Sequence, residues 1–243
     1  MGYNSSMIKK PYGILFDMGE TILLQKKHLP IKGIQAILDA LKYEGHLTSK
    51  DIFDIYNKII FGFVSRVRDE STLELNFQSF LRFLFEYVGI NIDSIPLNEL
   101  ELIYCKSTLE YVLAEGVLEL LSLMDELEIK KGILSNCWYS GNILRYDLEC
   151  HSIQNQFDFV ISSTDYCFRK PNTLIFDLAV RKLGFKHEDI WYLGDRFNYD
   201  VIGASNAGLF PVWFNHRRTS KLSEIDYLEI EKISELTNIL RRL

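Results

Sequence analysis

Short apolar runs alternate with amphipathic stretches at both ends of the chain. Each run has the length of a strand buried on both faces, and the runs lie at residues 14–16, 132–135, 157–161, 190–193 and 210–213. Apolar residues at helical spacing precede each of the four later runs, at about 117–127, 142–148, 173–183 and 201–207. This alternation predicts an α/β fold with a Rossmann-like, doubly wound parallel sheet and right-handed crossovers. After Ser220 we expect a mixture of turn and helix.

The middle of the chain, from about residue 31 to 111, shows helical spacing only. Residues 48–51 offer cap candidates for the second of these helices, and the last helix is predicted after Pro96 and through Val112. No strand is predicted here, so the region is predicted to be an inserted bundle of helices. We expect an α/β core at residues 1–24 and 115–243. An α-helical insert at residues 25–114 interrupts it.

Polar side chains follow several of the predicted strands, close to the point where each strand ends. In chain order they are Asp17, Ser135 with Asn136, Lys170, and Asp195 with Asp200. The carboxyl ends of parallel strands lie at one edge of a sheet, where ligands of open α/β folds bind, so we expect these side chains to meet. A carboxylate such as Asp17 is costly to bury there unless it pairs with a cation or takes part in chemistry.

This set of groups suits phosphoryl transfer. An aspartate can attack phosphorus and form an aspartyl phosphate. The attack requires the charges of both anions to be neutralised, which a lysine and a hard cation supply. Mg²⁺ takes oxygen ligands and keeps several waters, so a few carboxylates and one backbone carbonyl suffice to hold it.

Four motifs together resemble those of the haloacid dehalogenase superfamily of aspartyl-nucleophile hydrolases, in the same order. They are residues 16–21 (FDMGET), 134–136 (LSN), 169–171 (RKP) and 194–200 (GDRFNYD). The last matches the GDxxxxD pattern of that superfamily. The resemblance covers the whole chain, and residues 25–114 match its helical cap, inserted between the first two motifs. It implies a hydrolase, a phosphatase of a small phosphomonoester that uses Mg²⁺ as its cofactor.

The resemblance also implies a role for each motif residue. Asp17 would be the nucleophile, and Ser135 and Asn136 would hold the transferring phosphoryl group. Lys170 would neutralise the pair formed by Asp17 and the phosphoryl group. The metal ligands would include Asp17, the backbone carbonyl of Gly19 and Asp195, with Asp200 either supporting the metal or orienting the lysine.

One position departs from the pattern of phosphatases in this superfamily. Most of them carry a second Asp two residues after the nucleophile as general acid and base, and this chain has Gly19 there. Loss of such a group typically removes about 10²–10⁴ in rate. Glu20 is the nearest substitute acid, although it is one residue out of phase. A residue of the helical cap or a water molecule could serve in its place.

Two further functions stay open. A binding protein that kept the fold and lost its catalysis would explain Gly19, but it need not keep Asp17, Lys170, Asp195 and Asp200. A dehalogenase-like hydrolase would use Asp17 on carbon and needs no metal, but its tyrosine-bearing first motif is absent. Phosphoryl transfer through an aspartyl phosphate is therefore preferred.

Charge, apolar runs and cysteine spacing indicate which kinds of binding partner and cellular location to expect. The net charge of -6 argues against nucleic acid and anionic membranes, which favour basic surfaces, and no apolar run approaches the roughly 18 residues of a membrane span. The four cysteines are scattered without CxxC spacing, which favours a reduced, cytoplasmic protein. We expect a small phosphorylated metabolite as partner, with a monomer and a homodimer both compatible. The basic run at residues 216–218 is expected to be solvated or to pair with acids of the tail.

Overall fold

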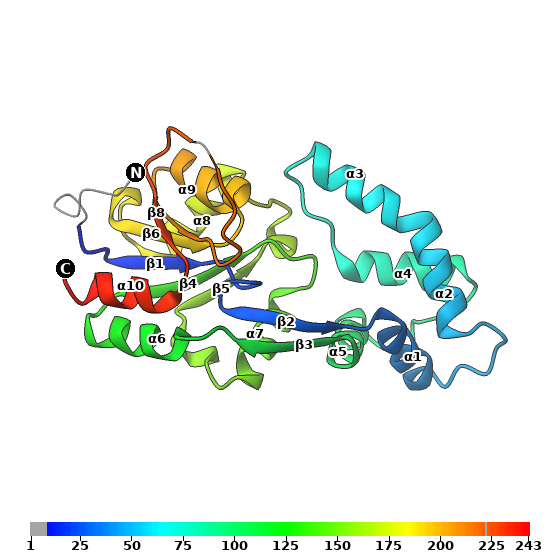
Figure 1. Cartoon of the computed structure of the whole chain (residues 1–243). Helices are drawn as coiled ribbons and strands as arrows, with labels where there is room; N and C mark the ends of the chain where they lie inside the picture. Colours follow the sequence, from blue (N-terminus) through cyan, green and yellow to red (C-terminus); the bar gives the residue numbers. More distant parts are fainter. Residues whose placement is uncertain (1–8, 222) are drawn as a thin grey trace.

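A computed structural model of the chain describes residues 9–221 and 223–243 (Figure 1). Its main sheet is six-stranded and parallel, in the order β5-β4-β1-β6-β7-β8. β1 lies inside the sheet because it pairs with both β4 and β6, and all of its residues are buried. The strands are β1 (Gly13–Phe16), β4 (Lys130–Ser135), β5 (Phe159–Ser162), β6 (Ile190–Gly194), β7 (Phe210–Phe214) and β8 (Leu228–Ile230). The predicted α/β fold with a parallel sheet is confirmed.

Alternation along the strands divides the core between the two faces of this sheet. Ile14 and Phe16 of β1 pack on one face with helices α6, α7 and α10, whereas Leu15 packs on the other face with α8 and α9. Successive side chains of a strand point to opposite faces, so one apolar run supplies both cores. Figure 1 shows α8 and α9 on one side of the sheet and α6 and α10 on the other. These helices are α6 (Val117–Glu126), α7 (Gly141–Cys150), α8 (Thr173–Leu183), α9 (Ile202–Asn206) and α10 (Ile233–Leu240).

A second cluster of helices lies beside the sheet (Figure 1). They are α1 (Pro30–Ala40), α2 (Ser49–Tyr56), α3 (Gly62–Glu70), α4 (Phe77–Tyr87) and α5 (Leu97–Thr108). The predicted start of α2 is confirmed, because Thr48 and Asp51 form a capping box in which each side chain accepts the backbone N–H of the other. The buried residues of these helices share a core that also takes in Tyr139 and Ile143 of the α/β part.

A two-stranded antiparallel ribbon connects the helical cluster to the sheet. It consists of β2 (Leu23–His28) and β3 (Leu109–Leu113). The prediction of a helix through Val112 is wrong beyond Thr108, because the chain turns extended at Leu109. Side chains of β3 alternate between half-buried and exposed, which is the pattern of a ribbon with one face in solvent. The boundaries at residues 25 and 114 fall within or next to this ribbon, and the division into core and insert stays a prediction.

The tail contains the predicted helix, α10, and also a strand that the sequence did not indicate. β8 has only three residues and adds to the edge of the sheet beside β7. Short 3-10 helices lie at Gln154–Gln156, Ser163–Tyr166 and His187–Asp189, and π-helical turns at Asn57–Phe61 and Phe197–Val201. In the described part of the chain, no helix combines the length and apolar character needed to cross a bilayer.

Candidate active site

The sheet brings the predicted site residues together at the carboxyl ends of its central strands. Asp17 directly follows β1, Ser135 ends β4, and Asp195 directly follows β6. The Asp17 N–H donates to the Leu193 carbonyl at 2.8 Å, so the backbone of Asp17 is still held by the neighbouring strand. The backbone from which the Asp17 carboxylate extends is therefore fixed at the carboxyl end of a central strand.

Lys170 lies between two of the acids, in the loop that leads to α8. Its Nζ donates to Asp17 Oδ1 at 2.8 Å and to Asp200 Oδ1 at 2.7 Å, and its side chain is 2% exposed. It also donates to the Tyr192 hydroxyl, which in turn donates to the Leu134 carbonyl. Burial alone would lower the pKa of Lys170, but the two carboxylates outweigh it and raise that pKa above its ordinary value. The lysine is therefore a fixed positive charge against Asp17.

Ser135 and Asn136 have different surroundings. The Ser135 hydroxyl lies at the site and donates to Asp17 Oδ1 at 3.3 Å. The Asn136 amide group instead pairs with the backbone of Lys170: its Nδ2 donates to the Lys170 carbonyl at 2.9 Å, and its Oδ1 accepts the Lys170 N–H at 2.7 Å. The side chain of Asn136 thus holds the loop that carries the lysine, a role the sequence did not indicate.

Three carboxylates gather beside the lysine. Asp17, Asp195 and Asp200 each offer an oxygen within 4.8 Å of the others. Burial, reinforced by the charges of the other two acids, raises the pKa of Asp195 to about 7. Burial also raises the pKa of Asp200, against the opposing charge of Lys170. Crowded carboxylates that are kept from water favour the binding of a cation.

The acids fit the predicted metal. Their donors are all oxygen, the type that Mg²⁺ prefers. Asp195 Oδ2 is buried and accepts no hydrogen bond from the described residues, although arginines lie near it. A carboxylate oxygen in this condition gains from a direct cation contact.

Local packing explains the GDxxxxD spacing. Asp200 Oδ2 accepts the Arg196 N–H at 2.7 Å, so the last residue of the motif is hydrogen-bonded to the backbone near its start. A Cβ at Gly194 would lie 2.3 Å from the Asp200 carboxyl carbon, so only glycine leaves room for that carboxylate. The glycine of this motif therefore permits the approach of the second aspartate.

Gly19 and Glu20 line the same cavity as the acids. A Cβ added to Gly19 would meet nothing within 4 Å, so the missing side chain leaves open space. Glu20 is already engaged: its Oε1 accepts the Gln25 N–H at 3.0 Å and its Oε2 lies 3.3 Å from Arg217 Nη2. Glu20 is therefore a weaker substitute acid than its position in the sequence indicates.

The cavity itself has a volume of about 490 Å³ and is bordered by both acidic and basic groups. Arg169 and Tyr199 stand in its wall, with the guanidinium 5.3 Å from the centre of the ring. Sequence reasoning missed Tyr192, which reads as one more apolar strand residue. It also missed Arg217, whose contacts join segments far apart in the sequence. Arg218 does pair with a tail acid, Glu231, as expected of the basic run.

The helical cluster reaches this site through the loop between α3 and α4. Glu74 Oε2 accepts the Ser163 hydroxyl at 2.8 Å and lies 3.7 Å from Arg169 Nε. Arg169 immediately precedes Lys170, and its backbone N–H donates to the Thr72 carbonyl at 2.8 Å. The loop at residues 72–74 is therefore bound to the segment that carries the buried lysine.

A second contact lies on α5. Glu101 Oε1 accepts the Ser140 N–H at 2.8 Å, and its Oε2 accepts the Ser140 hydroxyl at 2.7 Å and the Gln78 amide at 2.8 Å. Ser140 precedes α7, so this carboxylate stabilises the start of a helix of the α/β part. Two buried glutamates of the helical cluster thus bind the α/β part.

The fold and site agree with a comparison of the sequence with family models. A model described as haloacid dehalogenase-like hydrolase matches residues 14–214, most of the chain. The chain belongs to this family. The match includes all four motifs, so the family assignment and the geometry of the acidic site rest on the same residues.

Relatives in this family carry more than one activity. A glyceraldehyde 3-phosphate phosphatase of Methanothermobacter thermautotrophicus is 38% identical over 96 residues, which are 36% of this chain and 42% of the relative. An (S)-2-haloacid dehalogenase of Pseudomonas putida is 27% identical over 164 residues, 66% of this chain and 68% of the relative. The chain thus matches less than half the length of the phosphatase.

Solved structures support the fold. The crystal structure of a 2-haloacid dehalogenase from Pseudomonas syringae has a TM-score of 0.69 at 18% identity, covering 97% of this chain and 99% of that one. At this identity the likeness shows a shared fold only.

Proposed function

We propose that the protein hydrolyses a small phosphomonoester through an aspartyl phosphate on Asp17, with Mg²⁺ as its cofactor. The observation that carries the proposal is the Lys170 ammonium, buried between Asp17 and Asp200 with Asp195 close by. A buried cation against a carboxylate nucleophile offsets the repulsion that an incoming phosphate dianion meets. The phosphatase among the relatives supports the choice of substrate class.

The reaction has two displacements at phosphorus. An Asp17 oxygen bonds to phosphorus while the bond to the leaving oxygen breaks, and the leaving group takes a proton from water because Gly19 offers no acid. Water then attacks phosphorus and releases a proton to solvent, which replaces the one taken in the first step. The aspartyl–phosphate bond breaks, and inorganic phosphate leaves with Asp17 regenerated. Lys170 balances the negative charge at Asp17 in both steps, and the Ser135 hydroxyl donates at the same oxygen of Asp17.

Four residues would hold the metal: Asp17, the carbonyl of Gly19, Asp195 and Asp200. When bound, Mg²⁺ would supply positive charge to the oxygens of the phosphoryl group. Asn136 would act through the loop that carries Lys170, and its backbone is the part left to contact the phosphoryl group.

The helices at residues 25–114 would act as a cap that closes over the substrate and selects it. Lids of this kind exclude water and complete the site. The contacts of Glu74 and Thr72 with Arg169 support such a role, because Arg169 lines the cavity. Cytoplasmic location belongs to the same proposal, together with a small phosphorylated metabolite as partner and a monomeric or homodimeric state.

Release of inorganic phosphate from a panel of phosphomonoesters tests the proposal. We expect turnover that needs Mg²⁺, stops on chelation and disappears in Asp17→Asn. A folded wild-type protein that releases no phosphate across the panel would contradict it and would favour a binding protein impaired by Gly19.

The haloacid dehalogenase among the relatives favours a second candidate, hydrolysis of a carbon–halogen bond by the same Asp17. Halide release from 2-haloacids, measured with and without Mg²⁺, distinguishes the two. Halide without phosphate would replace the phosphatase proposal, whereas phosphate alone would remove this candidate.

A further inference from the structure

The loop after β7 contains a turn that is closed by hydrogen bonds between Asn215 and Thr219 and that carries Arg217. Asn215 is buried and anchors the turn: its Nδ2 donates to the Thr219 carbonyl at 2.8 Å, and its Oδ1 accepts the Thr219 N–H at 2.9 Å. The same Nδ2 donates to Glu229 Oε1 at 2.6 Å. These bonds fix the base of the turn and leave Arg217 near its tip.

Arg217 joins two other loops of the site. Its Nη1 lies 3.2 Å from Asp195 Oδ2, and its Nη2 lies 3.3 Å from Glu20 Oε2. The contact with Asp195 is an ion pair without hydrogen-bond geometry, since Oδ2 accepts no hydrogen bond from the described residues. The Arg217 side chain is 47% exposed. Because Arg217 is half-exposed and its contact with Asp195 lacks hydrogen-bond geometry, its side chain can move away from Asp195 while keeping its contact with Glu20.

Asp195 is also a proposed metal ligand, so two kinds of cation would meet at one carboxylate. Arg196 Nε lies 3.7 Å from the same oxygen, Oδ2. A guanidinium and a divalent cation that share a buried carboxylate repel each other, because attraction and repulsion are both strong where water is scarce. Both arginine contacts use Oδ2, so a divalent cation that binds this oxygen competes with them for it.

We propose that Arg217 is an exchangeable counter-ion of Asp195, which a divalent cation displaces and which therefore sets the affinity of the metal site. This inference rests on the proposed function, because it takes Asp195 as a metal ligand. Glu20 retains the displaced arginine, since it pairs with a different nitrogen of the same guanidinium. Arg217 thus positions Asp195 only while the metal is absent.

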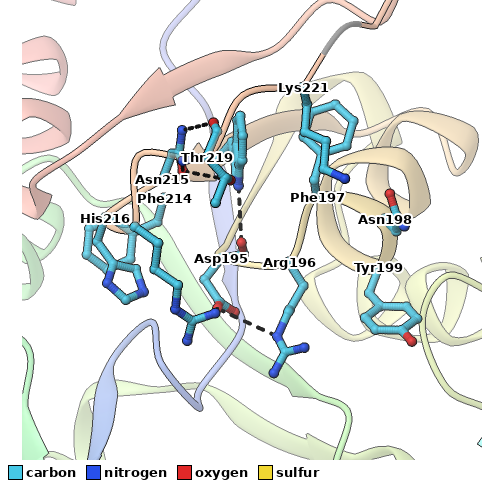
Figure 2. Close-up of a pocket in the computed structure, with 12 residues that line it drawn as sticks. Asp195, Arg196, Phe197, Asn198, Tyr199, Phe214, Asn215, His216, Thr219 and Lys221 are labelled. Atoms are coloured by element: carbon cyan, nitrogen blue, oxygen red, sulfur yellow. Dashed lines mark hydrogen bonds and ion pairs between the residues drawn. The ribbon is translucent and has the colours of Figure 1, made fainter.

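The surroundings give the displaced side chain room to move. A cavity of about 320 Å³ is lined by the loop that begins at Asp195 and by the turn between Asn215 and Thr219 (Figure 2), and Arg217 is among its lining residues. Arg196, Asn198 and Lys221 also line it, so this space contains polar and charged groups rather than a packed apolar wall. An arginine that leaves Asp195 can stay solvated there without unfolding the turn.

Calorimetric titration with Mg²⁺ alone, on the full chain, tests the exchange without any substrate. We expect Arg217→Gln to bind Mg²⁺ at least about threefold more tightly than wild type, because the competing charge is gone. Arg217→Lys keeps the charge and should stay near wild type. Arg218→Gln is the matched control, since Arg218 pairs with Glu231 and should leave the affinity unchanged.

Thermal unfolding supplies a second readout. Arg217→Gln removes the nearer of the two arginines at Asp195, so the rise in Tm on adding Mg²⁺ should be larger than in wild type. Weaker or unchanged Mg²⁺ binding in folded Arg217→Gln would overturn the exchange and would mean that the arginine orients Asp195 or has no part in metal binding. No Mg²⁺ binding to the wild-type protein would instead contradict the metal site in the proposed function.

Discussion

Two of the places where the described part of the chain buries acids differ in their surroundings. At the end of the sheet, Asp17, Asp195 and Asp200 crowd around one lysine, and Asp195 Oδ2 accepts no hydrogen bond from the described residues. At the contact with the helical cluster, Glu101 is 1% exposed, and its two oxygens accept three hydrogen bonds. Both regions bury negative charge, but both oxygens of Glu101 accept hydrogen bonds, whereas Asp195 Oδ2 lies near two arginines and accepts no hydrogen bond from the described residues.

The difference indicates which acids act on a ligand. A buried carboxylate whose oxygens are all occupied by donors stabilises the fold and has nothing left to offer. Carboxylates with raised pKa values, one of which has an oxygen that accepts no hydrogen bond from the described residues, are less well stabilised and gain more from a bound cation. Substitutions in the two regions should separate these roles, and the largest effect is expected at the lysine.

Replacing the buried lysine should affect both catalysis and folding. In Lys170→Met, Asp17 and Asp200 lose their shared cation, so activity should fall at least about 10²-fold and the free energy of unfolding should drop by about 3–5 kcal/mol. Urea unfolding and phosphate release measure the two effects. Lys131→Met is the control, because Lys131 is also buried and pairs with Asp125 away from the site. It should cost stability and leave turnover intact, whereas equal activity losses in both variants would contradict a special role for Lys170.

Restoring the missing acid should increase turnover. Open space around Gly19 accepts a side chain, so Gly19→Asp should raise kcat by up to about 10²–10⁴-fold if the acid reaches the leaving group. Gly19→Asn has nearly the same shape but no acid and should give no such gain. Equal rates in the two variants would mean that proton transfer is already supplied by another group.

The contact region should respond in stability rather than in metal binding. Glu101→Gln places an amide donor among groups that donate, and we expect a loss of about 1–3 kcal/mol in the free energy of unfolding. Mg²⁺ should not restore it. Glu99→Gln, on the exposed face of the same helix, should change stability little. A stability loss in Glu101→Gln that Mg²⁺ reverses would break the distinction between the two regions.

The raised pKa of Asp195 predicts a pH dependence. The pKa of Asp195 is about 7 in the folded state, against the usual 3.8. Between pH 3.8 and 7 the folded state therefore binds more protons than the unfolded state. The free energy of unfolding falls as pH rises through this range. Asp195→Asn removes this effect. Without metal, the variant should exceed wild type by on the order of 1–3 kcal/mol at pH 8 and match it near pH 4. Unfolding measured across this range would contradict the raised pKa if the difference did not change with pH.

The positions of Asp17 and Asp195 could be predicted because each directly follows a strand whose apolar run is unbroken. Asp17 after β1 and Asp195 after β6 needed only the pattern of the runs and the geometry of parallel sheets. The arginine contacts could not be predicted, since Arg217 and Glu20 are brought together by the order of strands and not by spacing. Tyr192 was hidden because an inward-facing tyrosine in a buried strand resembles any core residue.

The connection to the helical cluster was hidden for a related reason. β2 mixes Leu23 with charged residues such as Lys27, and its pairing partner β3 lies far along the chain. A ribbon of this kind is stable only when both strands are present, so neither segment shows a strand pattern strong enough by itself. Leu109 and Val112, three residues apart, imitated helical spacing although the segment is extended.

The most direct test of the proposed chemistry is Mg²⁺-dependent release of phosphate by wild type and by Asp17→Asn, with Mg²⁺ binding measured on both proteins. We predict steady turnover in wild type and a loss of more than about 10⁴-fold in the folded variant, since the attacking oxygen is gone. Comparable phosphate release by both proteins would contradict Asp17 as the nucleophile.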